Sequence, residues 1–297
     1  MARSLLELTA FRIRHDLELR CSLACCFSSL FISCLTCLLS SWNVYAIAGS
    51  ITLCISVCTA LNGWKEKWNS SQAALLGSVF GTAFMCLCRS SNKLEILFFR
   101  YTLCLTFFHY SEYIATALTN RRNLRPSSYL LDQSLHYWIA AVSSWLEFSL
   151  ESYFVPSIKS VSFSTFGVCL VICGESLRKV AMFQAKGSFT HTIATRKRSD
   201  HSLVTDGVYA FVRHPGYLGW FIWSVGTQIV LCNPVCVVSY AIVSWAFFED
   251  RIFWEEQSLV AFFGESYIRY RAKVPCGVPF IRGYDISMVH SFGSSHL

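Results

Sequence analysis

The sequence has few charged residues: Asp, Glu, Lys and Arg make up 14% of its 297 residues, whereas hydrophobic residues make up 54%. A soluble domain usually carries about 25% charged residues. Long apolar runs with few charges are typical of a chain that folds in lipid. The composition therefore argues against an ordinary soluble domain and indicates an integral membrane protein.

The apolar runs also lack the alternating polarity of barrel strands. Because every backbone polar group inside a bilayer needs an internal partner, continuous apolar runs predict helices. We predict an all-α integral membrane protein with about eight transmembrane helices, at residues 21–40, 42–61, 72–90, 94–118, 130–150, 160–183, 215–232 and 234–254. The first run shows no clear small-residue cleavage site, so we interpret it as a retained helix rather than a secretion signal.

Basic residues are scarce in the loops on one side of the predicted bundle, which contain only Arg89, Lys93 and Lys159. Eight spans place both termini on the other side. That side collects most of the basic residues of 178–213, together with Arg3, Arg12, Arg14, Arg20, Lys65, Lys67, Arg121, Arg122, Arg125, Arg251, Arg269, Arg271, Lys273 and Arg282. The positive-inside rule predicts that both termini are cytosolic. The formal net charge of +7 then reflects orientation and attraction to anionic lipid, and no nucleic acid partner is expected.

Nucleotide-binding and metal-binding patterns are missing. The sequence contains no GxGxxG and no GxxxxGK[ST], so neither a Rossmann domain nor a P-loop is predicted. Most of the fifteen cysteines lie inside apolar runs. Cys34 and Cys37 have CxxC spacing, but no second pair or histidine follows at zinc spacing. We interpret the cysteines as packing residues and predict no metal site.

The amino-acid composition changes along the chain. Residues 1–120 are rich in Ser, Cys, Leu and Ala and are interpreted as N-terminal transmembrane scaffold helices. Residues 121–297 are interpreted as the catalytic transmembrane region, and the two parts form one integrated membrane domain. The longest polar interval, 184–214, is predicted to face the cytosol. It contains too many apolar residues for a disordered segment, so we predict an ordered functional loop. Residues 255–283 predict an amphipathic extension at the cytosolic interface, with Gly264 separating two helices.

The segment RHPGYLGW at 213–220 predicts a helix start that faces polar surroundings. Pro215 fits the first turn of a helix, where its missing N–H costs nothing, and His214 would be the cap. The free N–H groups that follow are suited to binding an anion. The alternative is an ordinary membrane-boundary cluster of arginine, proline and aromatic residues.

Charged residues also occur at the end of the last apolar run, in FFEDRIFWEEQSL at 247–259. Arg251 and Glu255 are four residues apart and share one helix face, so one interpretation is a simple ion pair. Charges near membrane depth usually mark a functional pathway, however, and a guanidinium is the natural partner of a carboxylate. His109, Glu112, His136, Glu147 and Glu175 lie within predicted spans and are expected to pair inside the bundle. Arg178 and Lys179 are expected to snorkel to the interface.

Together, these segments resemble the isoprenylcysteine carboxyl methyltransferase family over about residues 170–283. The resemblance is carried by DHSLVTDGVYAFVRHPGYLGW at 200–220, GESLRKVAMF at 174–183, the Arg251–Glu255–Glu256 cluster and FFGESYIRYRAKVPCGVPFI at 262–281. It implies an enzyme of the endoplasmic reticulum membrane that uses S-adenosylmethionine and releases S-adenosylhomocysteine. The acceptor would be the C-terminal carboxylate of a farnesyl- or geranylgeranyl-cysteine on CAAX proteins, such as small GTPases, after trimming of their last three residues.

The resemblance also assigns roles to residues. Arg251 would bind the substrate carboxylate and is the candidate catalytic residue. The cofactor would be held by the backbone of Ala194 and by His201, Ser202, Leu203, Val204, Tyr209, His214, Pro215, Gly216, Tyr217 and Glu255. A carboxylate is ionised at pH 7 and a sulfonium methyl group is already activated, so no general base is expected. The enzyme must instead supply in-line positioning and a dry site.

Three other functions fit parts of this pattern. A membrane phospholipid N-methyltransferase would share the cofactor site, but it needs a base to remove a proton from an ammonium, and Arg251 would repel that cation. A sterol reductase would need NADPH and more spans. A transporter or lipid-binding scaffold would explain the buried polar residues without explaining the loop at 184–214.

Overall fold

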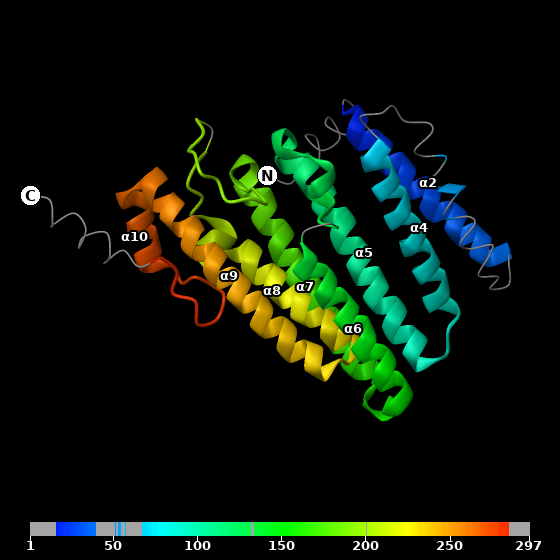
Figure 1. The fold of residues 1–297 in the computed structure, drawn as a ribbon. Coiled ribbons are helices and arrows are strands. Elements are labelled where there is room, and N and C mark those ends of the chain that lie inside the picture. The colour runs from blue at the N-terminus through cyan, green and yellow to red at the C-terminus, as the bar shows by residue number, and fades with distance from the viewer. Residues whose placement is uncertain are drawn as a thin grey trace, which may run out of the picture. The chain divides into compact units, whose positions relative to one another are not determined.

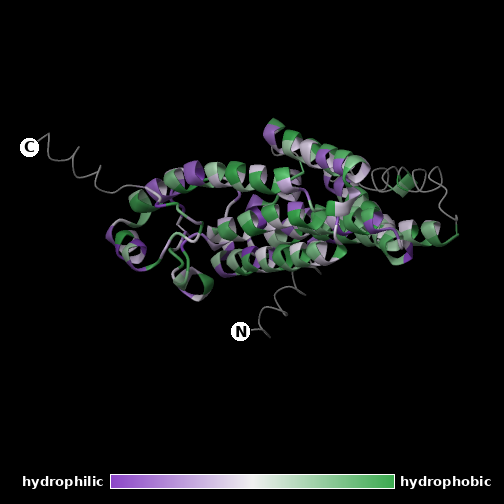
Figure 2. Cartoon of the chain, turned by 90° about the horizontal axis from the view of Figure 1, so that it is seen from below, coloured by the Kyte–Doolittle hydropathy of each residue, from purple (hydrophilic) through white to green (hydrophobic). Residues whose placement is uncertain are grey.

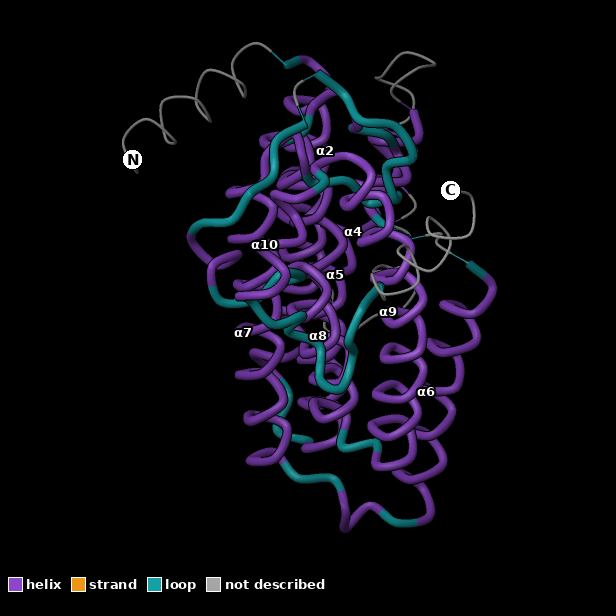
Figure 3. The backbone as a smooth tube through the Cα atoms, turned by 90° about the vertical axis from the view of Figure 1, so that its left-hand side faces the viewer, coloured by secondary structure: helices purple, strands orange, loops and turns teal. Residues whose placement is uncertain are grey.

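The computed structural model describes residues 16–39, 51, 53, 54, 57, 67–131, 134–199 and 201–284. Within these residues every regular element is a helix (Figure 3), which confirms the all-α prediction. The predicted run at 42–61 lies largely outside the described residues, as do Arg3, Arg12, Arg14 and Lys65 of the predicted cytosolic side.

The long helices coincide with the other predicted runs (Figure 1). They are α2 (Leu17–Leu39), α4 (Lys67–Arg89), α5 (Lys93–Thr119), α6 (Leu135–Phe154), α7 (Val161–Ala185), α8 (Pro215–Leu231) and α9 (Pro234–Phe263). Short 3-10 helices are η1 (Arg121–Asn123), η2 (Pro126–Tyr129), η3 (Pro156–Ile158), η4 (Lys186–Ser188) and η5 (Gly207–Ala210). The chain breaks at Gly264, whose φ is 53°, before α10 (Glu265–Lys273), as predicted.

Two of the described helices are long and apolar enough to cross a membrane by length and composition: α2 and residues 68–89 of α4. In Figure 2 green and white predominate on the long helices, with purple hydrophilic residues interspersed among them. The number of helices that cross the membrane stays a prediction.

The described contacts divide the chain into two compact units. The first unit comprises Met1–Val171 and Gly226–Cys236, and the second unit comprises Ile172–Val225 and Val237–Leu297. This division runs through α7, α8 and α9, whereas the division predicted after residue 120 followed a change in composition.

In the first unit, small residues allow α2 and α4 to pack closely. A Cβ at Gly81 would lie 2.7 Å from the carbonyl oxygen of Leu30, and one at Gly77 would overlap the carbonyl oxygen of Cys26. Ser22, Ser29 and Ser33 on α2 are buried. Small side chains let helix backbones approach each other in lipid, where the hydrophobic effect does not drive helix association.

Two polar residues predicted to lie within spans, His109 and Glu147, pair with neighbours in the first unit, as expected. The His109 ring nitrogens lie 2.8 Å from the carbonyl of Tyr129 and 2.8 Å from the hydroxyl of Tyr137. The Glu147 carboxylate accepts hydrogen bonds from the backbone N–H groups of Val235 and Cys236 at 2.7 Å, and so caps the first turn of α9. His136 differs from the expectation because its side chain is exposed.

Lys159, predicted as a loop residue, is buried beside the C-terminus of α8 in the first unit. Its ammonium donates to Glu151 at 2.7 Å and to the carbonyls of Leu231 and Cys232 and the side chain of Asn233 at 3.0 Å. The carbonyls at a helix C-terminus have no partner inside the helix and attract cations. Lys159 therefore fixes the end of α8.

Candidate active site

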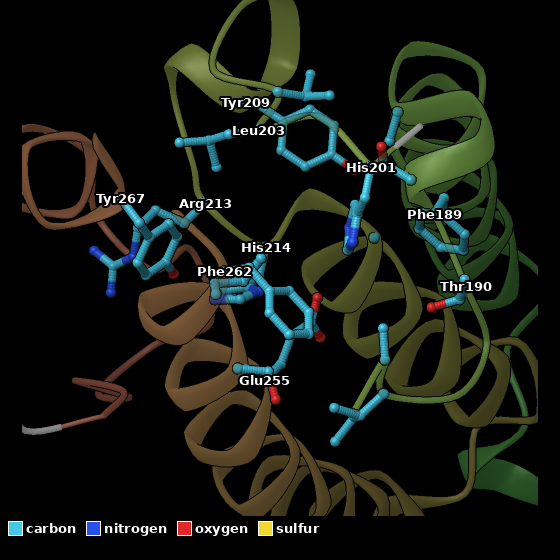
Figure 4. A pocket seen from close by; sticks show the side chains of 18 of the residues that line it. Phe189, Thr190, His201, Leu203, Tyr209, Arg213, His214, Glu255, Phe262 and Tyr267 are labelled. Atoms are coloured by element: carbon cyan, nitrogen blue, oxygen red, sulfur yellow. The ribbon is translucent and has the colours of Figure 1, made fainter. Parts of the chain in front are cut away.

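The second unit contains a cavity that all eleven residues of the predicted cofactor site line (Figure 4). Its walls come from the end of α7, the loop that follows it, the start of α8, the last turns of α9, and α10. The predicted residues around it are Ala194, His201, Ser202, Leu203, Val204, Tyr209, His214, Pro215, Gly216, Tyr217 and Glu255. The structure thus brings together residues that are up to 61 positions apart in the sequence.

The loop between α7 and α8 is ordered by contacts with the elements beside it. Lys197 donates to the carbonyl of Phe262 at the end of α9 at 2.7 Å, and its ammonium lies 4.6 Å from the ring centroid of Phe263. The backbone N–H of Ser202 donates to the hydroxyl of Ser188 at 3.2 Å. These contacts agree with the prediction of an ordered loop and keep His201 and its neighbours against the cavity.

The start of α8 has the geometry predicted for RHPGYLGW. Pro215 is the first residue of α8, and the carbonyl of His214 accepts hydrogen bonds from the N–H groups of Tyr217 and Leu218 at 3.1 and 3.0 Å. The backbone N–H groups of Arg213 and His214 donate to the carbonyls of Pro275 and Cys276 at 2.9 and 3.1 Å. The helix start is therefore anchored to the segment after α10.

Two glycines around this helix start lie where a side chain would meet a close neighbour. A Cβ at Gly216 would lie 2.8 Å from the Phe189 ring, which also lines the cavity. A Cβ at Gly219 would lie 2.6 Å from the carbonyl oxygen of Gly174, so α7 and α8 approach each other there with backbone contact. The two glycines allow the ring of Phe189 and the backbone of α7 to pack directly against α8.

The prediction that Arg178 snorkels to the interface is wrong. The side chain is buried, with 2% of its surface exposed. Its guanidinium donates to the carbonyl of Gly216 at 3.1 Å and lies 5.5 Å from the ring of Phe189 and 5.2 Å from that of Trp220. The close approach of α7 and α8 explains the difference, because it places an acceptor and two aromatic faces within reach of the side chain. Lys179 pairs with Glu175 at 2.9 Å.

Tyr217 connects the two charged residues that the sequence placed on one face of α9. Its hydroxyl accepts a hydrogen bond from Nε of Arg251 at 3.0 Å and donates a short one to Glu255. Its ring stacks on His214, with centroids 5.6 Å apart and planes at 11°. Arg251 also donates to the carbonyl of His191 in the loop. Arg251 therefore lies beside the cavity and does not line it. The side chain of Tyr217, which does, places its hydroxyl between Arg251 and Glu255.

The sequence assigned no separate role to Glu256, which is fully buried and organises the base of the cavity. Its carboxylate accepts hydrogen bonds from Arg213 at 2.9 Å, His214 at 3.2 Å, Tyr267 at 3.0 Å and the backbone N–H of Tyr284 at 2.9 Å, and it lies 3.4 Å from Arg271. Burial opposes its charge, but the hydrogen bond and charge of His214 and the two guanidiniums lower the pKa of Glu256 to about 2. Glu256 is thus a carboxylate that holds the side chains of Arg213 and His214.

Aromatic residues complete the cavity beyond the predicted set. Phe189, Phe262, Tyr267 and Tyr270 line it, and the His201 ring meets Phe262 edge-on at 5.6 Å. Figure 4 shows His201, His214, Glu255 and Phe262 around the same space. The sequence predicted an amphipathic extension at the cytosolic interface over residues 255–283, but not that this extension borders a cavity.

Comparisons with known proteins point to one family. The model of the isoprenylcysteine carboxyl methyltransferase (ICMT) family matches residues 167–261. Protein-S-isoprenylcysteine O-methyltransferase of Homo sapiens is 48% identical over 219 residues, covering 73% of this chain and 76% of the human protein. The Xenopus laevis protein of the same name is 46% identical over 244 residues, covering 80% and 84%. A solved structure of the eukaryotic intramembrane Ras methyltransferase ICMT, without a monobody, matches with a TM-score of 0.87 at 36% identity, covering 91% of this chain and 99% of that one.

Proposed function

Because this chain belongs to the isoprenylcysteine carboxyl methyltransferase family, we propose that its cavity binds S-adenosylmethionine and that Arg251 binds the carboxylate that receives the methyl group. The chain is a methyltransferase that acts on the carboxyl group of isoprenylcysteine, and its fold is that of a helical integral membrane protein. One observation supports the proposed site above all: Tyr217 lines the cavity and is hydrogen-bonded to Arg251.

The residues present fit the proposed cofactor. A sulfonium and an amino group are cationic, and the cavity offers the Glu255 carboxylate and the ring of Tyr217. A purine base needs flat apolar faces, and Phe189, Phe262 and Tyr209 provide aromatic surface. When bound, the cofactor supplies a methyl group that is already activated for transfer.

The chain's own contribution is to orient the acceptor. The Arg251 guanidinium is held by Tyr217 and by the carbonyl of His191. A guanidinium carries five N–H donors, so it can bind a carboxylate in a bidentate manner while keeping both contacts. Because a carboxylate is ionised at pH 7, no proton has to be removed before transfer. Fixing the carboxylate oxygen in line with the methyl group, away from water, is the main source of rate.

The proposal includes the cellular setting. The acceptors are prenylated CAAX proteins such as small GTPases after C-terminal trimming, and the apolar helices accommodate the prenyl chain in the membrane. We place the enzyme in the endoplasmic reticulum membrane with both termini and the cavity on the cytosolic side, in line with the distribution of basic residues.

The test is a transfer assay with radiolabelled S-adenosylmethionine, the purified full chain in lipid, and farnesylcysteine or phosphatidylethanolamine as acceptor. Label in farnesylcysteine is expected; label in the lipid amine would instead support the phospholipid N-methyltransferase.

The same assay tests Arg251. Arg251→Ala is expected to abolish transfer while isothermal titration still detects S-adenosylhomocysteine binding, because Arg251 lies behind the cavity wall rather than in it. The matched control is Arg269→Ala, which removes an exposed guanidinium from α10. Normal kcat and KM in Arg251→Ala would disprove the assigned role.

A further inference from the structure

The segment after α10 folds back along α9 within the second unit (red in Figure 1). The N–H of Tyr284 donates to Glu256 at 2.9 Å, and the indole of Trp245 donates to the carbonyl of Pro279 at 2.7 Å. Glu256 and Trp245 are eleven residues apart on one helix, which corresponds to about 16 Å along its axis. The loop therefore runs beside α9 over about this length, which is roughly half the thickness of a bilayer's hydrocarbon core.

Six carbonyl groups of residues 274–282 are hydrogen-bonded by protein donors. The carbonyls of Pro275 and Cys276 accept from the backbone of Arg213 and His214, and that of Val278 accepts from the N–H of Ile281 at 3.3 Å. Side-chain donors serve the carbonyls of Val274, Pro279 and Arg282. Pro275 and Pro279 bring no N–H. A loop in water can leave such groups to the solvent, whereas in lipid each unsatisfied group costs several kcal/mol, so these bonds lower the cost of removing this backbone from water.

The side chains of the loop are apolar on both faces. Cys276, Val278 and Ile281 pack against Phe248 and Ile252 in a buried cluster. On the other face Phe280 is 94% exposed and is held at a φ of 65°, which a phenylalanine rarely adopts.

This outer face continues the apolar surface of α9. Ile242, Val243 and Phe247, on the part of α9 around Trp245, are also exposed. The loop sequence VPCGVPFI at 274–281 carries no charge. The loop and this part of α9 therefore present an uncharged, largely apolar surface, which suits contact with lipid rather than with water.

We propose that residues 275–281 form a re-entrant loop inside the bilayer and that Phe280 packs against lipid acyl chains. The proposal rests on the membrane fold and not on the assigned cofactor site. It revises the sequence prediction for 255–283: the charged α10 fits the interface, but the loop after it lies deeper. Because the arms of the loop are bonded to Arg213 and His214, the lipid-facing loop also holds the start of α8 in place.

Photocrosslinking tests the depth of the loop. The full chain with Phe280→p-benzoylphenylalanine is reconstituted in phosphatidylcholine nanodiscs and irradiated, and lipid adducts are measured by mass spectrometry. The matched control is Thr195→p-benzoylphenylalanine, at an exposed position next to the basic residues Arg196 and Lys197. Lipid adducts are expected at position 280 and only at background level at 195. Their absence at 280, or equal yields at both positions, would overturn the proposal. The readout needs no activity, so failure of the methylation assay leaves it intact.

A second measurement compares Phe280→Asp with Phe280→Leu by thermal unfolding in the same nanodiscs. A residue that faces water accepts either change, whereas a lipid-facing site rejects a carboxylate. Phe280→Asp is expected to lower the Tm by several degrees and Phe280→Leu to keep the wild-type Tm. Equal Tm values for the two variants would place Phe280 in water. If Phe280→Asp does not fold, the crosslinking result decides.

Discussion

Replacing Glu256 with glutamine removes one negative charge and leaves two guanidiniums beside it without compensation. A pKa lowered from 4.5 to about 2 corresponds to about 3 kcal/mol, at about 1.4 kcal/mol per pKa unit. Removing one partner of a buried ion pair costs about 3–5 kcal/mol in other proteins, which is the same magnitude. At ~2–4 °C per kcal/mol for a chain of this size, Glu256→Gln is expected to lower the Tm by about 6–12 °C.

The assay is thermal unfolding in detergent micelles, with Glu265→Gln as the control. Glu265 is an exposed carboxylate in the first turn of α10, so its loss is expected to change the Tm little. Glu256→Gln is also expected to weaken S-adenosylhomocysteine binding, because a neutral amide oxygen holds the side chains of His214 and Arg213 less strongly than the carboxylate does.

The pH dependence gives an independent check. Because the pKa of Glu256 is lower in the folded chain than in the unfolded chain, its stabilisation is fully present above about pH 4.5 and is lost as the pH falls towards 2. The wild type is expected to lose stability over this range, and Glu256→Gln to lose correspondingly less. A variant with the wild-type Tm at pH 7, or an unchanged pH profile, would refute the reasoning.

Two further predictions concern the wall of the cavity. Gly216→Ala places a methyl group against the ring of Phe189, so it is expected to raise the KM for the cofactor. Adding Phe189→Leu is expected to restore part of the loss, and an unchanged KM in Gly216→Ala would contradict the contact. Arg178→Met leaves the carbonyl of Gly216 without the guanidinium donor, so it is expected to lower cofactor affinity in isothermal titration, with Arg178→Lys intermediate. Equal affinities for the wild type and both variants would show that the guanidinium does not position the start of α8.

The helices and the start of the site could be predicted because each depends on local chemistry. A continuous apolar run has to be a helix in lipid, and a proline after a histidine marks the start of α8 regardless of what packs around it. The break at Gly264 follows from the freedom of glycine to adopt a positive φ.

The roles of Arg178 and Glu256 depend on contacts between distant segments and could not be predicted from the sequence. Arg178 is buried because Gly174 and Gly219 bring two helices together, and neither glycine indicates its partner. Glu255 and Glu256 are adjacent in the sequence but about 100° apart around α9, so one lines the cavity and the other is enclosed beneath it. Nothing in the pair itself distinguishes them.

The Tyr217 hydroxyl accepts a hydrogen bond from Arg251 and donates one to Glu255, so the residues proposed to meet the acceptor and the methyl donor share a single oxygen atom. In the proposed site, the group that meets Arg251 and the group that meets Glu255 therefore influence each other's affinity. Thermodynamic linkage makes that influence reciprocal: the factor by which the acceptor changes the binding of the methyl donor equals the factor by which the donor changes the binding of the acceptor. Affinities measured for either ligand alone would consequently differ from those in the ternary complex by one common factor.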